Sequence, residues 1–164
     1  MRNLLVIAII AFAPPATARD FTIDGHLIDR CLAINDETPM RCVGRQADAC
    51  VDRNDGGPNM VVSACLENEL AFWDAFLNRT YARVLDRAHA EQSMDIGYAP
   101  DQLTNAVRSM QRSWLSYRDA TCDHELARAM PFGSAAGPAI NRCLMRETAR
   151  QVFQLIDIER SYRQ

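Results

Sequence analysis

Six cysteines limit the possible folds of this chain more than any other feature of its 164 residues. They are Cys31, Cys42, Cys50, Cys65, Cys122 and Cys143. An even number of cysteines is typical of a disulfide framework when the chain is exported. A zinc site would need closely spaced Cys-x-x-Cys pairs, whereas the nearest neighbours, Cys42 and Cys50, are eight residues apart. We therefore expect three disulfides and no metal site.

The first residues have the outline of a signal peptide, which predicts export. Arg2 precedes an apolar run over residues 4–12, and Ala16-Thr17-Ala18 supplies the small residues that signal peptidase requires. A membrane anchor is the alternative, but the run is too short to span a bilayer and no stop-transfer pattern or lipobox cysteine follows. We expect residues 1–18 to be removed, leaving a periplasmic or secreted chain without membrane insertion.

The mature chain is acidic. Its 17 arginines and 21 carboxylates give a formal charge of −4, and it contains no lysine. This charge does not favour a general affinity for nucleic acid or anionic membranes, and it mildly favours basic partners. No nucleic-acid partner is expected.

Apolar residues after the signal recur at intervals of three and four, the period of a helix, and no alternating strand-like run is present. The expected helices are a short one over about Asp24 to Ala33, a second from Thr38 and Pro39 to near Val51, and three long ones over Asn59 to Ala90, from a cap at Asp101 to Met130, and from Pro138 onward. Glycine and proline predict loops at 52–58, 93–100 and 131–137. Long helices joined by short loops pack antiparallel.

These elements predict an all-α fold in a single domain. We expect a disulfide-stapled antiparallel bundle of three long helices over residues 59–164, preceded by a short helical pair over 19–58 that packs with it as one unit. The apolar stripes expected to fill the core are Leu66, Leu70, Trp73, Leu77, Tyr81, Val84 and Ala88; Leu103, Val107, Met110, Trp114, Tyr117 and Thr121; and Ile140, Leu144, Val152, Leu155 and Ile156.

Helical hairpins also suggest how the cysteines pair, although six cysteines allow fifteen pairings and the sequence alone does not choose among them rigorously. Residues equally far from a hairpin loop lie at equal height, which brings Cys122 close to Cys143 across their loop. The same geometry favours Cys31 with Cys42, and leaves Cys50 for Cys65. We expect a framework of these three local disulfides.

Two stretches of the long helices carry a family resemblance that covers roughly residues 60 to 156. The motif residues are Glu69, Asp74, Leu77, Asn78 and Tyr81 after Cys65; Gln111, Trp114, Tyr117, Arg118 and Asp119 before Cys122; and Leu144, Thr148 and Arg150 after Cys143. This pattern resembles the LprI-like lysozyme inhibitor family. The resemblance implies a helical bundle without a cofactor, and a role in inhibiting lysozyme.

The chain departs from the common pattern of that family in two places. A Pro131-Phe132-Gly133-Ser134 turn replaces the more usual double glycine, and residues 19–58 add a cysteine-bearing helical pair ahead of the motif. The lipid-modified cysteine of some members is absent, which favours a free periplasmic protein. The added pair offers a partner surface of its own.

Arg118 stands out among the candidate site residues, because a partly buried arginine needs carboxylate or carbonyl partners. We expect it to bridge to Glu69, Asp74 and Asn78 on the preceding long helix, as a polar clamp between the helices. The alternative is a patch that faces a partner.

Helix 59–90 carries more aromatic residues, Phe72, Trp73 and Phe76, than one apolar stripe needs. We expect the N-terminal helical pair to cover them. The alternative is that one or two of them stay exposed as anchors for a partner.

No catalytic constellation is present. His26, His89 and His124 are scattered along the chain without ligand or triad spacing, so neither catalytic residues nor a metal site are predicted. An enzyme that uses the carboxylates of Glu69 and Asp74 is disfavoured, because a three-helix bundle seldom offers a sugar-binding cleft.

We therefore expect an exported binding protein that captures lysozyme or another basic protein. The alternative function is a structural or assembly module of the cell envelope, with no enzyme partner. Residues 52–58, 92–100 and 130–137 are the loops that would protrude toward a partner, and the sequence does not choose among them. It leaves the oligomeric state open.

Overall fold

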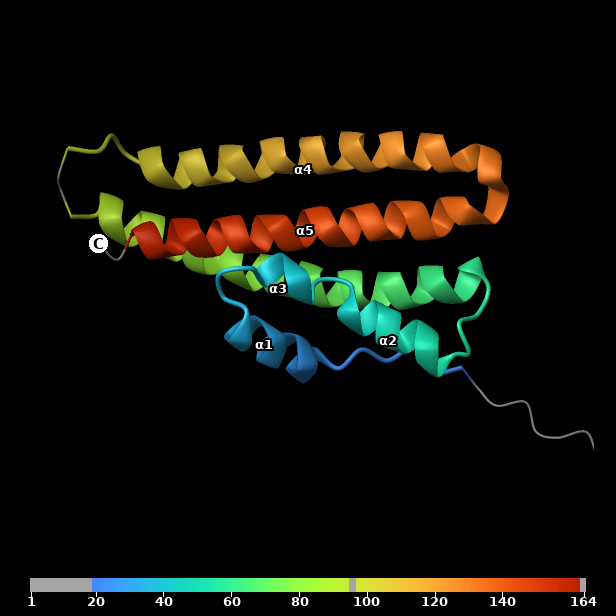
Figure 1. Ribbon diagram of the computed structural model, residues 1–164. Helices are drawn as coiled ribbons and strands as arrows, with labels where there is room; N and C mark the ends of the chain where they lie inside the picture. Colours follow the sequence, from blue (N-terminus) through green and yellow to red (C-terminus); the bar gives the residue numbers. More distant parts are fainter. Residues whose placement is uncertain (1–18, 95–96, 163–164) are drawn as a thin grey trace, which may run out of the picture.

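The computed structural model describes residues 19–94 and 97–162, and all regular elements in these ranges are helical (Figure 1). The α-helices are α1 (Gly25–Ile34), α2 (Arg45–Arg53), α3 (Asn59–Gln92), α4 (Gln102–Ala129) and α5 (Ala136–Ser161), and the 3₁₀ helices are η1 (Pro39–Cys42) and η2 (Met130–Ala135). This confirms the predicted all-α class. The predicted signal peptide, residues 1–18, lies outside the described residues.

The three long helices form the antiparallel bundle. Consecutive helices reverse direction, and α5 packs against both α3 and α4 (Figure 1). The core is filled by Val61, Leu66, Trp73, Leu77, Val84 and Ala88 of α3, Val107 of α4, and Met145, Ala149, Val152 and Leu155 of α5. The predicted stripe of α3 therefore supplies most of the α3 core. In α5 only Val152 and Leu155 were predicted, whereas Met145 and Ala149 were not. The stripe of α4 differs from the prediction, because Tyr117 is 58% exposed.

The second short helix is interrupted, contrary to the continuous helix expected from Thr38 to Val51. The 3₁₀ turn η1 ends at Cys42, and Gly44 then adopts a left-handed conformation with φ of +93° before α2 begins at Arg45. Glycine adopts such a backbone at no steric cost. The break turns the chain so that the amides at the start of α2 point toward α3.

The start of α4 is capped from a neighbouring helix. Asp101 occupies the N-cap position, as predicted, but its side chain makes no capping hydrogen bond. Instead, Gln92 Oε1 at the end of α3 accepts a hydrogen bond from the Leu103 amide at 3.2 Å. The predicted loop at 131–137 is the 3₁₀ turn η2, and α5 begins two residues before the predicted Pro138.

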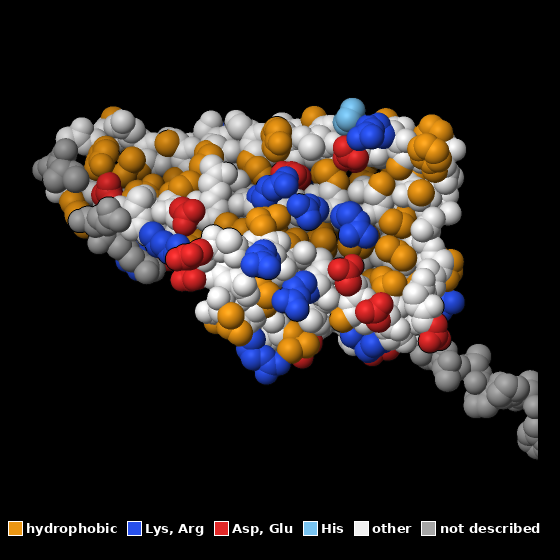
Figure 2. All heavy atoms as spheres, in the orientation of Figure 1, with side chains coloured by type: hydrophobic (Ala, Val, Ile, Leu, Met, Phe, Trp, Pro, Cys, Tyr) orange, Lys and Arg blue, Asp and Glu red, His pale blue; other side chains and the backbone are white. Residues whose placement is uncertain are grey.

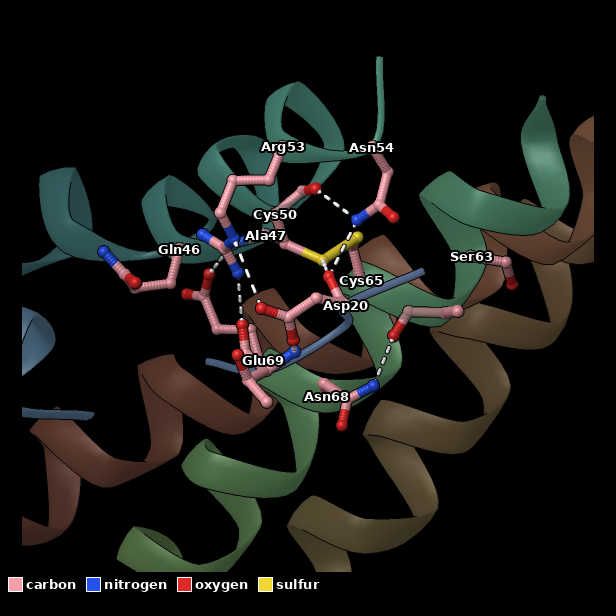
Figure 3. Close-up of a disulfide and its surroundings, with 12 residues drawn as sticks. Asp20, Gln46, Ala47, Cys50, Arg53, Asn54, Ser63, Cys65, Asn68 and Glu69 are labelled. Carbon is pink, nitrogen blue, oxygen red and sulfur yellow. Dashed lines mark hydrogen bonds and ion pairs between the residues drawn. A yellow bond between two sulfur atoms is a disulfide. The ribbon is translucent and has the colours of Figure 1, made fainter. Parts of the chain in front are cut away.

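Three disulfides staple these elements. The structure joins Cys31 to Cys42, Cys50 to Cys65, and Cys122 to Cys143, the pairings favoured by the hairpin geometry. The second disulfide ties α2 to α3 beside Glu69 and Ala47 (Figure 3). Disulfides persist in oxidising compartments, so this framework fits a protein exported from the cytoplasm. None of the helices in the described ranges is both long and apolar enough to cross a membrane.

The N-terminal segment, residues 19–58, covers one side of α3. A Cβ atom built on Gly25 of α1 would lie only 2.9 Å from the ring of Phe72. Trp73 is fully buried and stacks on Phe76, with ring centroids 6.2 Å apart. Phe72 and Phe76 are half-buried. This agrees with the expectation that the N-terminal pair packs over the extra aromatic residues.

Candidate functional site

A groove between α3 and α4 is lined by six residues of the family motif. It has a volume of about 570 Å³. Its lining consists of Asp74, Leu77, Asn78 and Tyr81 of α3 and of Arg108, Gln111, Arg112, Leu115 and Arg118 of α4. We call these nine residues the motif groove. They come from two helices only.

The α3 side of the motif groove follows from helical spacing. Asp74, Asn78 and Tyr81 are separated by four and three residues, which places them on one face of α3. The Asp74 and Asn78 side chains are exposed, and no described residue makes an ion pair or hydrogen bond with either of them. Leu77, on the same face, is buried. The two polar side chains therefore face solvent and are available to a partner.

The α4 side carries three guanidinium groups. Arg108 and Arg112 are exposed and lie one turn apart. Arg118 is held in place: it donates from Nε and Nη2 to Asp119 Oδ1 at 2.9 and 2.8 Å, and its guanidinium lies over the Trp114 ring, 5.1 Å from the centroid. Such contacts fix the side chain before any ligand arrives.

Gln111 anchors the floor of the motif groove. Its Oε1 accepts a hydrogen bond from Gln151 Nε2 of α5 at 3.0 Å, and both side chains are buried. This bond joins α4 to α5 directly beneath the groove. The position of the arginines on α4 is therefore tied to the core of the bundle.

The predicted clamp between Arg118 and three residues of α3 does not form. Arg118 pairs with Asp119 of its own helix, while Asp74 and Asn78 share the motif groove with it but make no bond to it. Glu69 lies on another face of α3, because five residues advance a helix by about 140° beyond a full turn. The offset of five between Glu69 and Asp74 separates these two carboxylates.

Glu69 is a structural anchor instead. It is fully buried, and its carboxylate accepts hydrogen bonds from the Gly44 amide at 2.6 Å, the Ala47 amide at 2.7 Å and Trp73 Nε1 at 3.0 Å. A carboxylate at a helix N-terminus satisfies amides that have no partner within the helix. Glu69 thus docks the start of α2 onto α3 (Figure 3).

The remaining motif residues lie away from the motif groove. Thr148 is buried in α5, and its hydroxyl has no hydrogen-bond partner among the described residues. Arg150 is exposed on α5 and forms an ion pair with Glu147, which is buried. The sequence reasoning missed Arg108, Arg112 and Leu115. These residues and Arg118 follow one another at intervals of four, three and three residues. This helical spacing predicts that they share one face of α4.

The described residues offer no candidate metal site. They contain no group of three or more histidine, cysteine, aspartate or glutamate side chains that could hold a metal ion. The motif groove combines three guanidinium groups, one carboxylate, one phenol and the side-chain amides of Asn78 and Gln111. This set can donate and accept hydrogen bonds and carry charge, which suits recognition of a polar surface.

Comparisons with known proteins identify the family. The family described as lysozyme inhibitor LprI matches residues 50–155, which include the whole motif groove. An uncharacterised protein of Rhizobium meliloti is 30% identical over 105 residues, covering 62% of this chain and 74% of the relative. An uncharacterised 17.7 kDa protein encoded in the puhA 5′ region of Rhodobacter capsulatus is 26% identical over 134 residues, covering 76% and 78%. No solved structure matches. Because the family match spans well over half of the residues, this chain belongs to the lysozyme inhibitor LprI family.

Proposed function

We propose that the mature protein is a periplasmic or secreted binding protein that inhibits lysozyme, and that it catalyses no reaction of its own. The observation that carries this proposal is the family match over residues 50–155. The match contains both helices that line the motif groove. We further propose that this groove, rather than one of the three loops, is the face presented to the enzyme.

The charges of the motif groove support this assignment. A glycosidase of the lysozyme type works with two carboxylates in its cleft. Arg108 and Arg112 are exposed and have no ion pair with a described residue. Arg108 Nη1 donates a hydrogen bond to Asn105 Oδ1 at 3.3 Å, and the other guanidinium donors of the two residues can bind carboxylates. Arg118 is already held by Asp119 and Trp114, which lowers the entropy lost on binding.

The charge of the whole mature chain supports the choice of partner. Its formal charge of −4 attracts a basic protein over distance and speeds the encounter. The local arginines then face the acidic cleft of the same enzyme. Long-range attraction thus comes from the negative net charge of the chain, and local recognition from its positive arginines. Asp74 and Asn78 remain as acceptors for basic groups at the rim of the lysozyme cleft.

The test is lysis of cell-wall substrate by lysozyme, titrated with the oxidised mature protein. We expect inhibition that saturates near one protein per enzyme. The variant Arg112→Glu places a negative charge opposite the catalytic carboxylates and should weaken inhibition about tenfold or more. Arg87→Glu, an exposed arginine of α3 outside the motif groove, makes the same charge change and should have a several-fold smaller effect.

Two results would contradict the proposal separately. If the wild-type protein inhibits none of several lysozyme types, lysozyme is not its partner. If it inhibits but both charge reversals weaken inhibition equally, the partner is right and the motif groove is not the binding face. Far-ultraviolet circular dichroism of each variant establishes that the helices are intact.

A further inference from the structure

A second concave site lies between α4 and α5, and a row of arginines lines it. Arg142, Arg146 and Arg150 of α5 face Thr121 and Glu125 of α4 around a cavity of about 490 Å³. The site shares no residue with the motif groove. Figure 2 shows arginine side chains gathered in a band across the middle of the molecule, over the position that α5 occupies in Figure 1.

The geometry of the row comes from the helix itself. The three arginines are four residues apart, so they lie on one side of α5 with a rise of about 6 Å between neighbours. All three residues are exposed. Cys143 lines the same cavity, and its disulfide to Cys122 holds α4 and α5 with a Cα–Cα distance of 5.5 Å. The row is therefore presented on a covalently braced support.

The nearby carboxylates leave two of these arginines uncompensated. The nearly buried Glu147 pairs with Arg150, and Glu125 lies 3.5 Å from Arg128 and 3.7 Å from His124. Arg142 and Arg146 have no acidic partner within ion-pair distance in the described part of the chain. Three arginines and two glutamates line the cavity, and Arg128 pairs with one of these glutamates from outside it.

Fold stability does not account for this arrangement. Like charges four residues apart on a helix repel one another and destabilise it slightly. A bound anion would remove that repulsion. Guanidinium groups bind phosphate through paired hydrogen bonds, and two such groups one turn apart match a ligand that carries more than one phosphate.

We propose that this cavity binds a ligand bearing two or more phosphate groups, with Arg142 and Arg146 as the groups that contact them. Glu147 orients Arg150 at one end of the row, and Thr121 supplies a hydroxyl from α4. The phosphates belong to one soluble polyphosphate, or to adjacent phospholipid headgroups that a membrane surface presents together. This function is independent of lysozyme binding, because the two sites share no residues.

Calorimetric titration of the oxidised mature protein with inorganic tripolyphosphate, at low ionic strength, tests the proposal. We expect one binding site per chain, an affinity that falls as salt is added, and a rise in the unfolding temperature with the ligand present. The double variant R142Q/R146Q should weaken binding by about tenfold or more, because it removes hydrogen bonds from charged donors. The control R30Q/R87Q removes the same charge from two other exposed arginines and should change affinity by less than about threefold.

Sedimentation with vesicles distinguishes the two sources of phosphate. If phosphatidylglycerol vesicles, but not phosphatidylcholine vesicles, carry the wild-type protein down and R142Q/R146Q abolishes this, the ligand is a membrane surface. If only tripolyphosphate binds, the ligand is soluble. The proposal is overturned if neither probe binds, or if R142Q/R146Q and R30Q/R87Q bind equally well.

Discussion

Among single residues, Glu69 shows most clearly how a family motif can serve the fold rather than the site. Its carboxylate accepts bonds from two backbone amides of the N-terminal segment and from the indole of Trp73. All of these donors are buried beside it. The sequence reasoning could identify Glu69 as a motif residue, but two of its three partners are main-chain amides 22 and 25 residues away. Side-chain chemistry alone gives no signal for such partners.

The substitution Glu69→Gln tests this anchor. An amide offers only one acceptor oxygen, and its NH₂ group would face N–H donors, so at least one buried donor loses its partner. We expect the free energy of unfolding to fall by about 1–3 kcal/mol. Urea unfolding of the oxidised mature protein measures it. Glu67→Gln, an exposed position on the same helix, should change stability by less than about 0.5 kcal/mol, and equal losses in the two variants would refute the anchor.

Predictability also differs among the residues of the motif groove. Asp74, Asn78 and Arg118 could be chosen from the motif, and the structure brings all three to one groove. The predicted bonds between Arg118 and the other two residues do not form, because Arg118 has a nearer partner in Asp119. A neighbouring residue on the same helix needs no tertiary packing to be reached. Local pairing therefore prevailed over the clamp between helices.

On the scale of helices, the long elements were predictable from their apolar residues. When such residues recur every three or four positions over many turns, the helix is the only regular structure that places them on one face. The short N-terminal elements were not predictable. Gly44, with its positive φ, separates the 3₁₀ turn η1 from helix α2. The residues next to Gly44 give no sequence signal for this break. The capping of α4 by Gln92 was equally hidden, since it depends on how the ends of α3 and α4 meet.

The end of α3 joins two other segments through Glu91, and this contact predicts a pH dependence. Tyr98 donates a hydrogen bond to Glu91 Oε1 at 2.8 Å, and this bond raises the pKa of Tyr98 because the phenolate would face a carboxylate. Burial raises the pKa of Tyr162 after α5, and the charge of Glu91 raises it further. Both phenols thus hold their protons more tightly in the folded chain.

The variant Glu91→Gln should bring the pKa of Tyr98 closer to the ordinary value of about 10. Alkaline titration of the tyrosinate absorbance measures the change, with Glu67→Gln as the control. A raised folded pKa stabilises the native state below the unfolded value, and this stabilisation is lost as pH rises through the folded value. The wild type should therefore lose stability above about pH 10 more steeply than Glu91→Gln. Superimposable titration curves would show that Glu91 does not act on these tyrosines.

For the whole molecule, the main question is whether the N-terminal segment and the bundle unfold together. The family match begins at residue 50, so most of residues 19–58 lies outside it. We propose a single cooperative unit. The Cys50–Cys65 disulfide, the Glu69 carboxylate and the packing of α1 on Phe72 all cross the boundary. Without the segment, the buried charge of Glu69 would lose two of its three donors, which is a large cost for a small domain.

Native-state hydrogen exchange tests this cooperativity residue by residue. If the chain unfolds as one unit, the Ala47 amide, which is bonded to Glu69, should exchange with the same free energy as the core amides of α5 near Val152. The variant C50S/C65S removes a 15-residue covalent loop, worth about 3 kcal/mol. If that loss is confined to the N-terminal segment, Ala47 should then exchange through a lower-energy opening while α5 stays protected.

One result in the wild type would contradict the single unit. If Ala47 exchanges more than about tenfold faster than α5, the free energies of opening differ by about 1.4 kcal/mol or more. The segment is then a separate unit docked on the bundle. In that case its surface would be free to move relative to the motif groove, and it would not contribute to the rigidity of that groove.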